Sequence, residues 1–256
     1  MGNIHLVIPD PHAHYKNNNE RADWVGRLIV DLKPEVVINM GDMFDMPSLS
    51  GYDKGKKSFQ GRTYRADVDA GLEFDERLWA PIRKAKKRRP KSVYLIGNHD
   101  ERIARAVEYQ PELEGMIGYK DLELNKNYDY IVDYEGRTPG SIEVDGIQYA
   151  HYFPSGVMGR PIGGDVRPAH SLLLKRHVSS TQAHSHTLDW AMQTAGNGKK
   201  IMGLFSGCFL DYEPDYAGST NDLWWRGVII KHNVSDGTYD PEFISMARLK
   251  ELYDTW

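Results

Sequence analysis

The chain has 256 residues, of which 40% are hydrophobic and 27% charged, with a formal net charge of -4. A chain of this length can bury one large core, and its weakly acidic balance supplies no overall basic field to attract nucleic acid. The single cysteine, Cys208, excludes an internal disulfide and suits a reducing compartment, so we expect a cytoplasmic protein. No apolar run approaches the ~18 residues of a membrane span. The first residues also lack the basic and apolar regions of a signal peptide.

The first half of the chain alternates short apolar runs with segments of helical spacing. The predicted elements are strand 4–8, helix 20–32, strand 36–40, loop 46–66, helix 67–88, strand 92–96 and helix 101–109. Short β-branched runs bounded by Gly or Pro indicate buried strands. Because the strands alternate with helices, we expect parallel pairing through right-handed crossovers.

The second half is predicted to be mostly β-structure. Asp145-Gly146 separates two apolar runs and indicates a hairpin. The expected elements are strands 141–144 and 148–152, helix 167–179, and strands 200–205, 227–233 and 242–247. No repeat or linker interrupts the chain, so we expect one domain over residues 1–256. This order favours an α/β fold with two sheets packed face to face and helices outside.

Polar clusters directly follow three of the predicted strands. The clusters, in chain order, are Asp10-Pro11-His12, Gly41-Asp42-Met43-Phe44-Asp45, Gly97-Asn98-His99-Asp100, His151 alone, and Ala183-His184-Ser185-His186. Open α/β sheets place their ligand sites at the carboxyl ends of strands. Oxygen ligands and imidazoles in this number are sufficient for two metal ions.

Residue spacing within the clusters suggests how the ligands are divided. Asp10 and His12 lie two residues apart, so on an extended segment both project to the same side and can bind one ion. His184 and His186 repeat this spacing, and we expect one imidazole for each ion. Two divalent ions that act on a phosphate ester need a carboxylate between them. Asp42 is the expected bridge. Asn98 offers an amide oxygen and His151 a further imidazole.

In order, spacing and residue type, the clusters resemble the calcineurin-like metallophosphoesterase superfamily. Its pattern is Asp-x-His, Gly-Asp-x-x-Asp, Gly-Asn-His-Asp/Glu, a lone His, and Gly-His-x-His, and the match covers about residues 4–210. The resemblance implies a four-layer α/β/β/α sandwich of two mixed sheets. It also implies a dinuclear centre of two divalent ions, with manganese favoured and iron, zinc, nickel or magnesium as alternatives.

The resemblance also implies a role for each residue of the centre. One ion would take Asp10, His12, Asp42 and His186. The second would take Asp42, Asn98, His151 and His184. His99 would stand outside the ligand shell and donate to the phosphoryl oxygen or leaving group, so that His99 and Asp42 are the expected catalytic residues.

The chain departs from the family pattern at two positions. Ala13 and Ala183 replace glycines, and because Ala disfavours positive φ the loop shapes are expected to differ. Asp45 is expected to orient a ligand or the turn. Asp100 has two equally weighted interpretations, as a helix cap or as a support of the site. His14 is expected at the rim, and Cys208 as a small packing residue near the site.

The expected function is hydrolysis of a phosphate ester, with phosphodiesters favoured, as by a nuclease or a nucleotide phosphodiesterase. The loop from Tyr52 to Arg65 is the reason, because its lysines, arginines and aromatics suit a polyanion with bases to stack. An alternative is a phosphomonoesterase, including a protein serine/threonine phosphatase, with Arg102, Arg105 and Arg160 as candidates for binding a dianion. A metal-binding scaffold without catalysis is the third hypothesis. No sequence feature indicates an oligomeric state.

Overall fold

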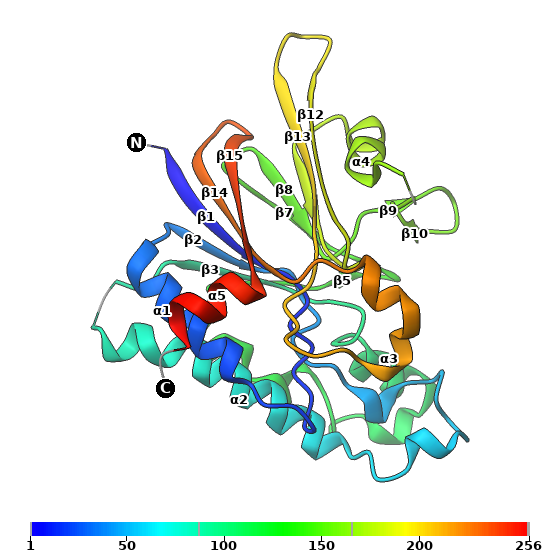
Figure 1. Cartoon of the computed structure of the whole chain (residues 1–256). Coiled ribbons are helices and arrows are strands. Elements are labelled where there is room, and N and C mark those ends of the chain that lie inside the picture. Colours follow the sequence, from blue (N-terminus) through cyan, green and yellow to red (C-terminus); the bar gives the residue numbers. More distant parts are fainter. Residues whose placement is uncertain (1, 87, 165, 255–256) are drawn as a thin grey trace.

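A computed structural model describes residues 2–86, 88–164 and 166–254, and its largest sheet has six strands (Figure 1). The strand order is β15-β14-β1-β2-β3-β4. The bounds are β1 (Asn3–Ile8), β2 (Val36–Asn39), β3 (Lys91–Leu95), β4 (Tyr130–Val132), β14 (Gly227–Ser235) and β15 (Thr238–Ser245). Strands β1 to β4 pair in parallel, whereas β14 and β15 are antiparallel, so the sheet is mixed.

The second sheet has five strands in the order β12-β13-β11-β8-β7. Its strands are β7 (Ser141–Val144), β8 (Ile147–Ala150), β11 (Ser180–Gln182), β12 (Leu188–Thr194) and β13 (Lys200–Ser206). The hairpin predicted at Asp145-Gly146 is confirmed, with φ of 51° and 79° at the two turn residues. Two small ribbons pair β5 (Tyr134–Glu135) with β6 (Thr138–Pro139), and β9 (Pro154–Ser155) with β10 (Arg160–Pro161).

Helices cover the outer faces of the sheets. The α-helices are α1 (Glu20–Leu32), α2 (Tyr64–Lys84), α3 (Arg102–Tyr109), α4 (Pro168–Arg176) and α5 (Met246–Tyr253). The 3-10 segments are Pro47–Leu49, Lys57–Phe59, Pro111–Leu113, Tyr119–Leu122, Leu124–Lys126 and Asp215–Leu223. Helices α1, α2 and α5 share one core with the six-stranded sheet, whereas α4 packs against the other sheet (Figure 1). Among the residues described, no helix has the length and apolarity needed to cross a membrane.

The inner faces of the two sheets pack against each other. Val7, Ile38 and Val93 from the six-stranded sheet share a buried cluster with Tyr149 and Leu204 from the five-stranded sheet. Strand β1 is therefore apolar on both faces, because its alternate residues pack on the helices. Burial on both faces explains why the central strands are continuous apolar runs in the sequence.

Several predicted helix boundaries shift in the structure. Helix α2 begins at Tyr64 rather than at residue 67, because Thr63 caps it by accepting a hydrogen bond from the Ala66 amide. It ends at Lys84 rather than 88, and residue 87 lies outside the described residues. Helix α4 ends at Arg176, where His177 takes a left-handed φ of 59°.

The predicted strand 242–247 is wrong at its end. Strand β15 stops at Ser245, whose side chain caps α5 by accepting from the Arg248 amide. The sequence-based prediction also missed α5, β4, β11 and β12. Strand β11 has three residues and β4 three, too short for a periodic pattern to be visible.

A lysine is buried between the sheets near the start of β1. Lys231 Nζ donates to Thr181 Oγ1 at 2.5 Å and to the Tyr149 hydroxyl at 3.2 Å, and Nζ lies 4.4 Å from the centroids of the Tyr149 and Tyr239 rings. His5 contacts the same Tyr149 hydroxyl at 2.8 Å. No carboxylate pairs with Lys231 in the described part of the chain, and burial lowers the pKa of this lysine well below its usual value.

The depressed pKa of Lys231 gives a pH dependence with a definite sign. The unfolded lysine stays protonated up to about pH 10.4, whereas the folded one loses its proton at a lower pH, so between these two pKa values the unfolded state binds more protons and stability rises with pH. As the pH rises toward about 10.4, the free energy of unfolding of the wild type should therefore rise relative to that of Lys231→Met, by at most about 1.4 kcal/mol per pH unit. Urea unfolding at a series of pH values measures the difference. Lys54→Met, an exposed control, should follow the wild type, and parallel profiles for Lys231→Met would mean that the buried amine keeps its charge.

Candidate metal centre

The polar clusters converge at one end of both sheets. The loops after β1, β2, β3, β8 and β11 supply, in turn, Asp10 and His12, Asp42, Asn98 and His99, His151, and His184 and His186. Strands β1, β2 and β3 are mutually parallel, as are β8 and β11. Each sheet therefore brings its carboxyl ends to the same place, which is where the sequence predicted the site.

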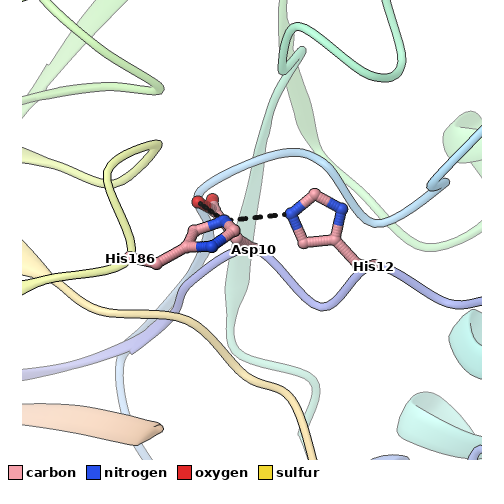
Figure 2. A group of neighbouring side chains, drawn as sticks. All are labelled: Asp10, His12 and His186. Atoms are coloured by element: carbon pink, nitrogen blue, oxygen red, sulfur yellow. Dashed lines mark hydrogen bonds and ion pairs between the residues drawn. The ribbon is translucent and has the colours of Figure 1, made fainter. Parts of the chain in front are cut away.

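The first group consists of Asp10, His12 and His186 (Figure 2). His186 Nε2 lies 3.2 Å from Asp10 Oδ2 and 3.1 Å from His12 Nε2. The other carboxylate oxygen, Asp10 Oδ1, is buried and has no hydrogen-bond partner among the described residues, and His151 Nδ1 lies 3.6 Å from it. Two imidazole nitrogens facing each other beside an unsatisfied carboxylate oxygen fit a cation, since burial of such an oxygen is costly unless something binds it.

The second group consists of Asp42, His151 and His184. His151 Nε2 lies 3.4 Å from Asp42 Oδ2. The Asn98 amide oxygen lies 2.9 Å from His151 Nε2 and 2.6 Å from His184 Nδ1, so it belongs to the same cluster. These side chains can hold a second cation.

Asp42 lies between the two groups. Its Oδ2 atom is 3.9 Å from His12 Nε2 on one side and 3.4 Å from His151 Nε2 on the other. His12, Asp42 and His99 also form a third set of ligand-type atoms within 4.8 Å of one another. A carboxylate with this access to both groups can contact two ions.

Hydrogen bonds fix the orientation of two of the histidines. His12 Nδ1 lies 3.0 Å from Asp45 Oδ1, and His151 Nδ1 lies 2.9 Å from the Met40 carbonyl oxygen. Both partners are acceptors, so in the neutral imidazoles each Nδ1 donates and each Nε2 keeps its lone pair for a ligand bond. This arrangement is typical of metal-binding imidazoles.

The backbone at the site is left-handed at many non-glycine positions. Positive φ values occur at Asp10 (34°), His12 (42°), Asp42 (52°), His184 (68°) and His186 (61°). The expectation that these His and Asp pairs lie on extended segments is therefore wrong. Contacts between loops impose the local turns: the His12 amide donates to the Asp42 carbonyl oxygen at 2.9 Å, and the His184 amide to Asp10 Oδ2 at 2.8 Å.

The alanines at the two departures from the family pattern fit without strain. Neither Ala13 nor Ala183 has a positive φ, and both are buried. Glycine is required instead at Gly41 and Gly97. A Cβ on Gly97 would lie 2.1 Å from Asp42 Oδ1, and a Cβ on Gly41 would lie 2.4 Å from the Leu95 carbonyl oxygen. The close approach of the two loops therefore depends on these glycines.

The Asp100 carboxylate supports the site rather than capping a helix. Its Oδ2 accepts from the amides of Asp42 and Gly97, both at 2.9 Å, and Oδ1 accepts from the Phe44 amide at 3.2 Å. The Tyr94 hydroxyl donates to Oδ2 at 2.9 Å. Burial and the nearby Asp42 charge raise the pKa of Asp100 to about 7.

Burial and charge act in opposite directions on the pKa values of the candidate ligands. Burial alone would raise the pKa of Asp42, but His151, His99 and His12 outweigh it and hold the pKa below its usual value. Burial and the neighbouring His151 lower the pKa of His184 to about 4. At neutral pH the carboxylate is therefore ionised and His184 neutral, the forms that bind metals.

His99 stands beside the ligand-type side chains of the two groups. Its ring centroid lies 4.5 Å from that of His12, and its amide donates to Asp42 Oδ1 at 2.7 Å. His99 Nδ1 lies 2.8 Å from the Asp45 carbonyl oxygen. Burial lowers the pKa of His99.

The other residues named as candidates from the sequence make contacts outside the two groups. Arg105 is ion-paired with Glu101 at 2.8 Å, and Arg160 lies on β10. Cys208 is buried, with Sγ 3.6 Å from the Trp225 carbonyl oxygen, as expected of a packing residue. His14 is half-buried and stacks on Tyr15 at 4.6 Å between ring centroids.

The sequence-based prediction missed three aromatics that contact the ligands. Trp224 lies edge-on to His186 at 4.2 Å, and Tyr152 lies 4.9 Å from His184, both between ring centroids. The Tyr212 hydroxyl donates to the His12 carbonyl oxygen at 2.7 Å. Tyr152 adjoins His151 in sequence and could have been noticed, whereas Tyr212 and Trp224 lie outside any motif.

The loop from Tyr52 to Arg65 is less cationic than its sequence indicates. Arg62 and Lys56 both pair with Asp53, at 2.7 and 3.3 Å, and Arg65 pairs with Asp69 on α2 at 2.9 Å. Within the described residues, only Lys54 and Lys57 of the five cations lack an ion pair.

Comparison with protein-family models and with curated proteins returns no match. Among solved structures, a protein described as a novel archaeal phosphodiesterase aligns over 94% of this chain and 99% of its own, with 12% identity and a TM-score of 0.44. The protein TT1561 of Thermus thermophilus aligns over 95% of this chain and 99% of its own, with 11% identity and a TM-score of 0.39. Similarity this weak carries no functional argument. The resemblance to calcineurin-like metallophosphoesterases depends on the motif residues and on their convergence.

Asp100→Ala should weaken both folding and metal binding, because it leaves three buried amides without an acceptor. We expect the free energy of unfolding to fall by about 2–5 kcal/mol and the affinity for manganese to fall by about 10–100-fold. Urea unfolding and metal titration of the folded variant measure the two effects. Asp69→Ala, at an exposed carboxylate, should change stability by no more than about 0.5 kcal/mol. Normal metal affinity in a folded Asp100→Ala protein would show that Asp42 keeps its position without this carboxylate.

Proposed function

We propose that the protein is a metal-dependent phosphoesterase with a dinuclear centre, and that it hydrolyses phosphodiesters. The observation that carries the proposal is the position of Asp42, which lies within reach of two separate groups of ligand-type side chains. When bound, two divalent ions would activate a water molecule and neutralise charge on the phosphoryl group.

The proposed ligand sets follow the two groups. Asp10, His12, Asp42 and His186 would hold one ion, and Asp42, Asn98, His151 and His184 the other. The unsatisfied Asp10 Oδ1 and the inward-facing Nε2 atoms of His12 and His151 support this division. Mixed carboxylate, amide and imidazole ligands suit manganese, and iron, zinc, nickel or magnesium are alternatives that metal availability would decide.

The chain's own residues have three tasks in this proposal. Asp42 provides the negative charge between the ions. Asp45 holds the imidazole of His12 through the hydrogen bond at Nδ1, and it contacts His99 Nδ1 at 2.9 Å. His99 lies beside the proposed ligands, where Nε2, once it takes up a proton in place of its contact with Arg102 Nη2, would donate to the phosphoryl oxygen or the leaving group.

The proposed architecture is a four-layer α/β/β/α sandwich that forms a single domain over residues 1–256. It is supported by the shared core of the two sheets and by the helices on their outer faces (Figure 1). Both sheets contribute proposed ligands, so the site forms only when the two sheets are packed together.

Nucleic acid or a nucleotide remains the proposed source of the phosphodiester, but the structure weakens the reason for it. The ion pairs of Lys56, Arg62 and Arg65 leave fewer free cations on the loop to bind a polyanion. A panel of single-stranded DNA, duplex DNA, RNA, cyclic nucleotides and phosphopeptides, assayed with manganese, identifies the substrate class. Preference for phosphopeptides would favour a phosphatase.

Asp42→Asn tests the dinuclear centre. Removal of the charge between two cations should lower the metal content below two ions per chain and abolish hydrolysis of bis(p-nitrophenyl) phosphate, while the fold is retained. Elemental analysis, circular dichroism and the esterase assay check the three parts. Comparison with p-nitrophenyl phosphate separates diesterase from monoesterase. If the wild type binds two ions and hydrolyses no ester on the panel, the scaffold hypothesis replaces the enzyme.

His99→Asn tests the role of the histidine outside the ligand sets. Metal content should stay normal, and hydrolysis should slow by about 10²–10⁴-fold, the usual contribution of a general acid. The loss should be smaller for p-nitrophenyl esters than for alkyl esters, because a good leaving group needs less protonation. Equal losses for both would mean that His99 binds the phosphoryl group instead.

A further inference from the structure

Arg102, the first residue of α3, points its guanidinium into the loop that follows Asp42. Nη1 donates to the carbonyl oxygens of Asp45 and Met46, at 2.9 and 3.1 Å. Nη2 lies 3.2 Å from His99 Nε2. Arg102 is thus fixed between the second and third clusters, next to the metal centre.

The contacts of His99 show which atom donates in this pair. His99 Nδ1 faces two acceptors of Asp45, the carbonyl oxygen at 2.8 Å and Oδ1 at 2.9 Å, so Nδ1 carries the hydrogen. Nε2 then holds a lone pair and accepts from Arg102 Nη2. In this neutral form of His99 the N–H groups beside Nε2 belong to the arginine, and His99 can act as a donor only after Nε2 takes up a proton.

The charge of Arg102 is not neutralised locally. In the described part of the chain no carboxylate forms an ion pair with it, whereas Arg105, one turn later on α3, is paired with Glu101. Arg102 is only half-buried, and Nε–H and one Nη2 hydrogen have no partner among the described residues. A guanidinium with free donors binds phosphate oxygens well, because its planar N–H groups match their geometry.

We infer that Arg102 is a phosphoryl-binding residue. This inference rests on the proposed function and gives the proposed site a second source of positive charge beside the metal ions. Arg102 would donate to a non-bridging phosphoryl oxygen of the substrate next to His99. The carbonyls of Asp45 and Met46 hold the guanidinium in position before the substrate arrives, so little side-chain entropy is lost on binding. Of the three arginines suggested by the sequence, Arg102 contacts His99, whereas Arg105 is paired with Glu101 and donates to the Asn98 carbonyl oxygen at 3.3 Å.

The test measures inorganic phosphate binding to the manganese-loaded protein by isothermal titration. Arg102→Gln should weaken phosphate binding by about 10–100-fold, as expected for the loss of a charged hydrogen bond. Arg102→Lys should lie between this variant and the wild type, because it keeps the charge without the planar fork. Arg248→Gln, which removes the same charge from the exposed face of α5, should bind phosphate normally. Metal content should be unchanged in all three variants, and the loss of kcat/KM for an aryl phosphodiester should come mainly from KM.

Several results would overturn the assignment. Wild-type phosphate affinity in Arg102→Gln would mean that Arg102 only holds the carbonyl groups of Asp45 and Met46 in place and does not bind phosphate. Loss of metal together with phosphate binding would mean that the arginine builds the centre rather than binding substrate. If Arg102→Gln does not fold, the lysine variant decides, and wild-type phosphate affinity in it overturns the assignment. Ester hydrolysis by the wild type distinguishes failure of the proposed function from failure of the Arg102 assignment. If the wild type hydrolyses no ester but binds phosphate through Arg102, only the proposed function is wrong.

Discussion

The buried carboxylate of Asp100 holds the site together. It accepts hydrogen bonds from amides in two loops, those of Asp42 and Phe44 after β2 and that of Gly97 after β3. In a low-dielectric interior these amides would be costly to leave unpaired, so the carboxylate fixes both loops at once. The positions of Asp42, Asn98 and His99 all follow from this one anchor.

The close packing of these loops has a steric requirement. Asp42 Oδ1 would be 2.1 Å from a Cβ on Gly97, so the carboxylate can occupy its place only because residue 97 has no side chain. The His99 amide then donates to the same oxygen at 2.7 Å and leaves Oδ2 facing the histidines of both groups. The geometry that would allow Asp42 to bind both proposed ions is therefore built by backbone contacts.

Left-handed backbone at Asp10, His12, Asp42, His184 and His186 implies stored strain. Non-glycine residues in this region cost about 1–3 kcal/mol each. Packing of the sheets from which these loops extend offsets this free-energy cost, because the central strands of the six-stranded sheet are buried on both their inner and outer faces. The arrangement holds imidazoles and carboxylates close together before any cation binds. A bound cation would offset the free-energy cost of keeping these groups out of water.

The sequence alone determined the elements that local chemistry specifies. Apolar runs ending in Gly or Pro predicted β1, β2 and β3, and Asp145-Gly146 predicted the hairpin, because strand burial and turn geometry depend on neighbouring residues. The order of the clusters predicted which Asp, Asn and His side chains would meet. Short strands such as β4 and β11 carry too few residues for a pattern, and only pairing with neighbours makes them strands.

Only the tertiary structure decided how these residues are used. The spacing of Asp10 and His12 suggested an extended segment, but hydrogen bonds to another loop force positive φ at both. The sequence left Asp100 open between a helix cap and a support, and could not rank Arg102 above Arg105. Those choices depend on the loop after β2, whose Asp42 and Phe44 amides donate to Asp100 and whose Asp45 and Met46 carbonyl oxygens accept from Arg102. Sequence spacing fixes which side chains are available, and tertiary packing fixes which atoms they face.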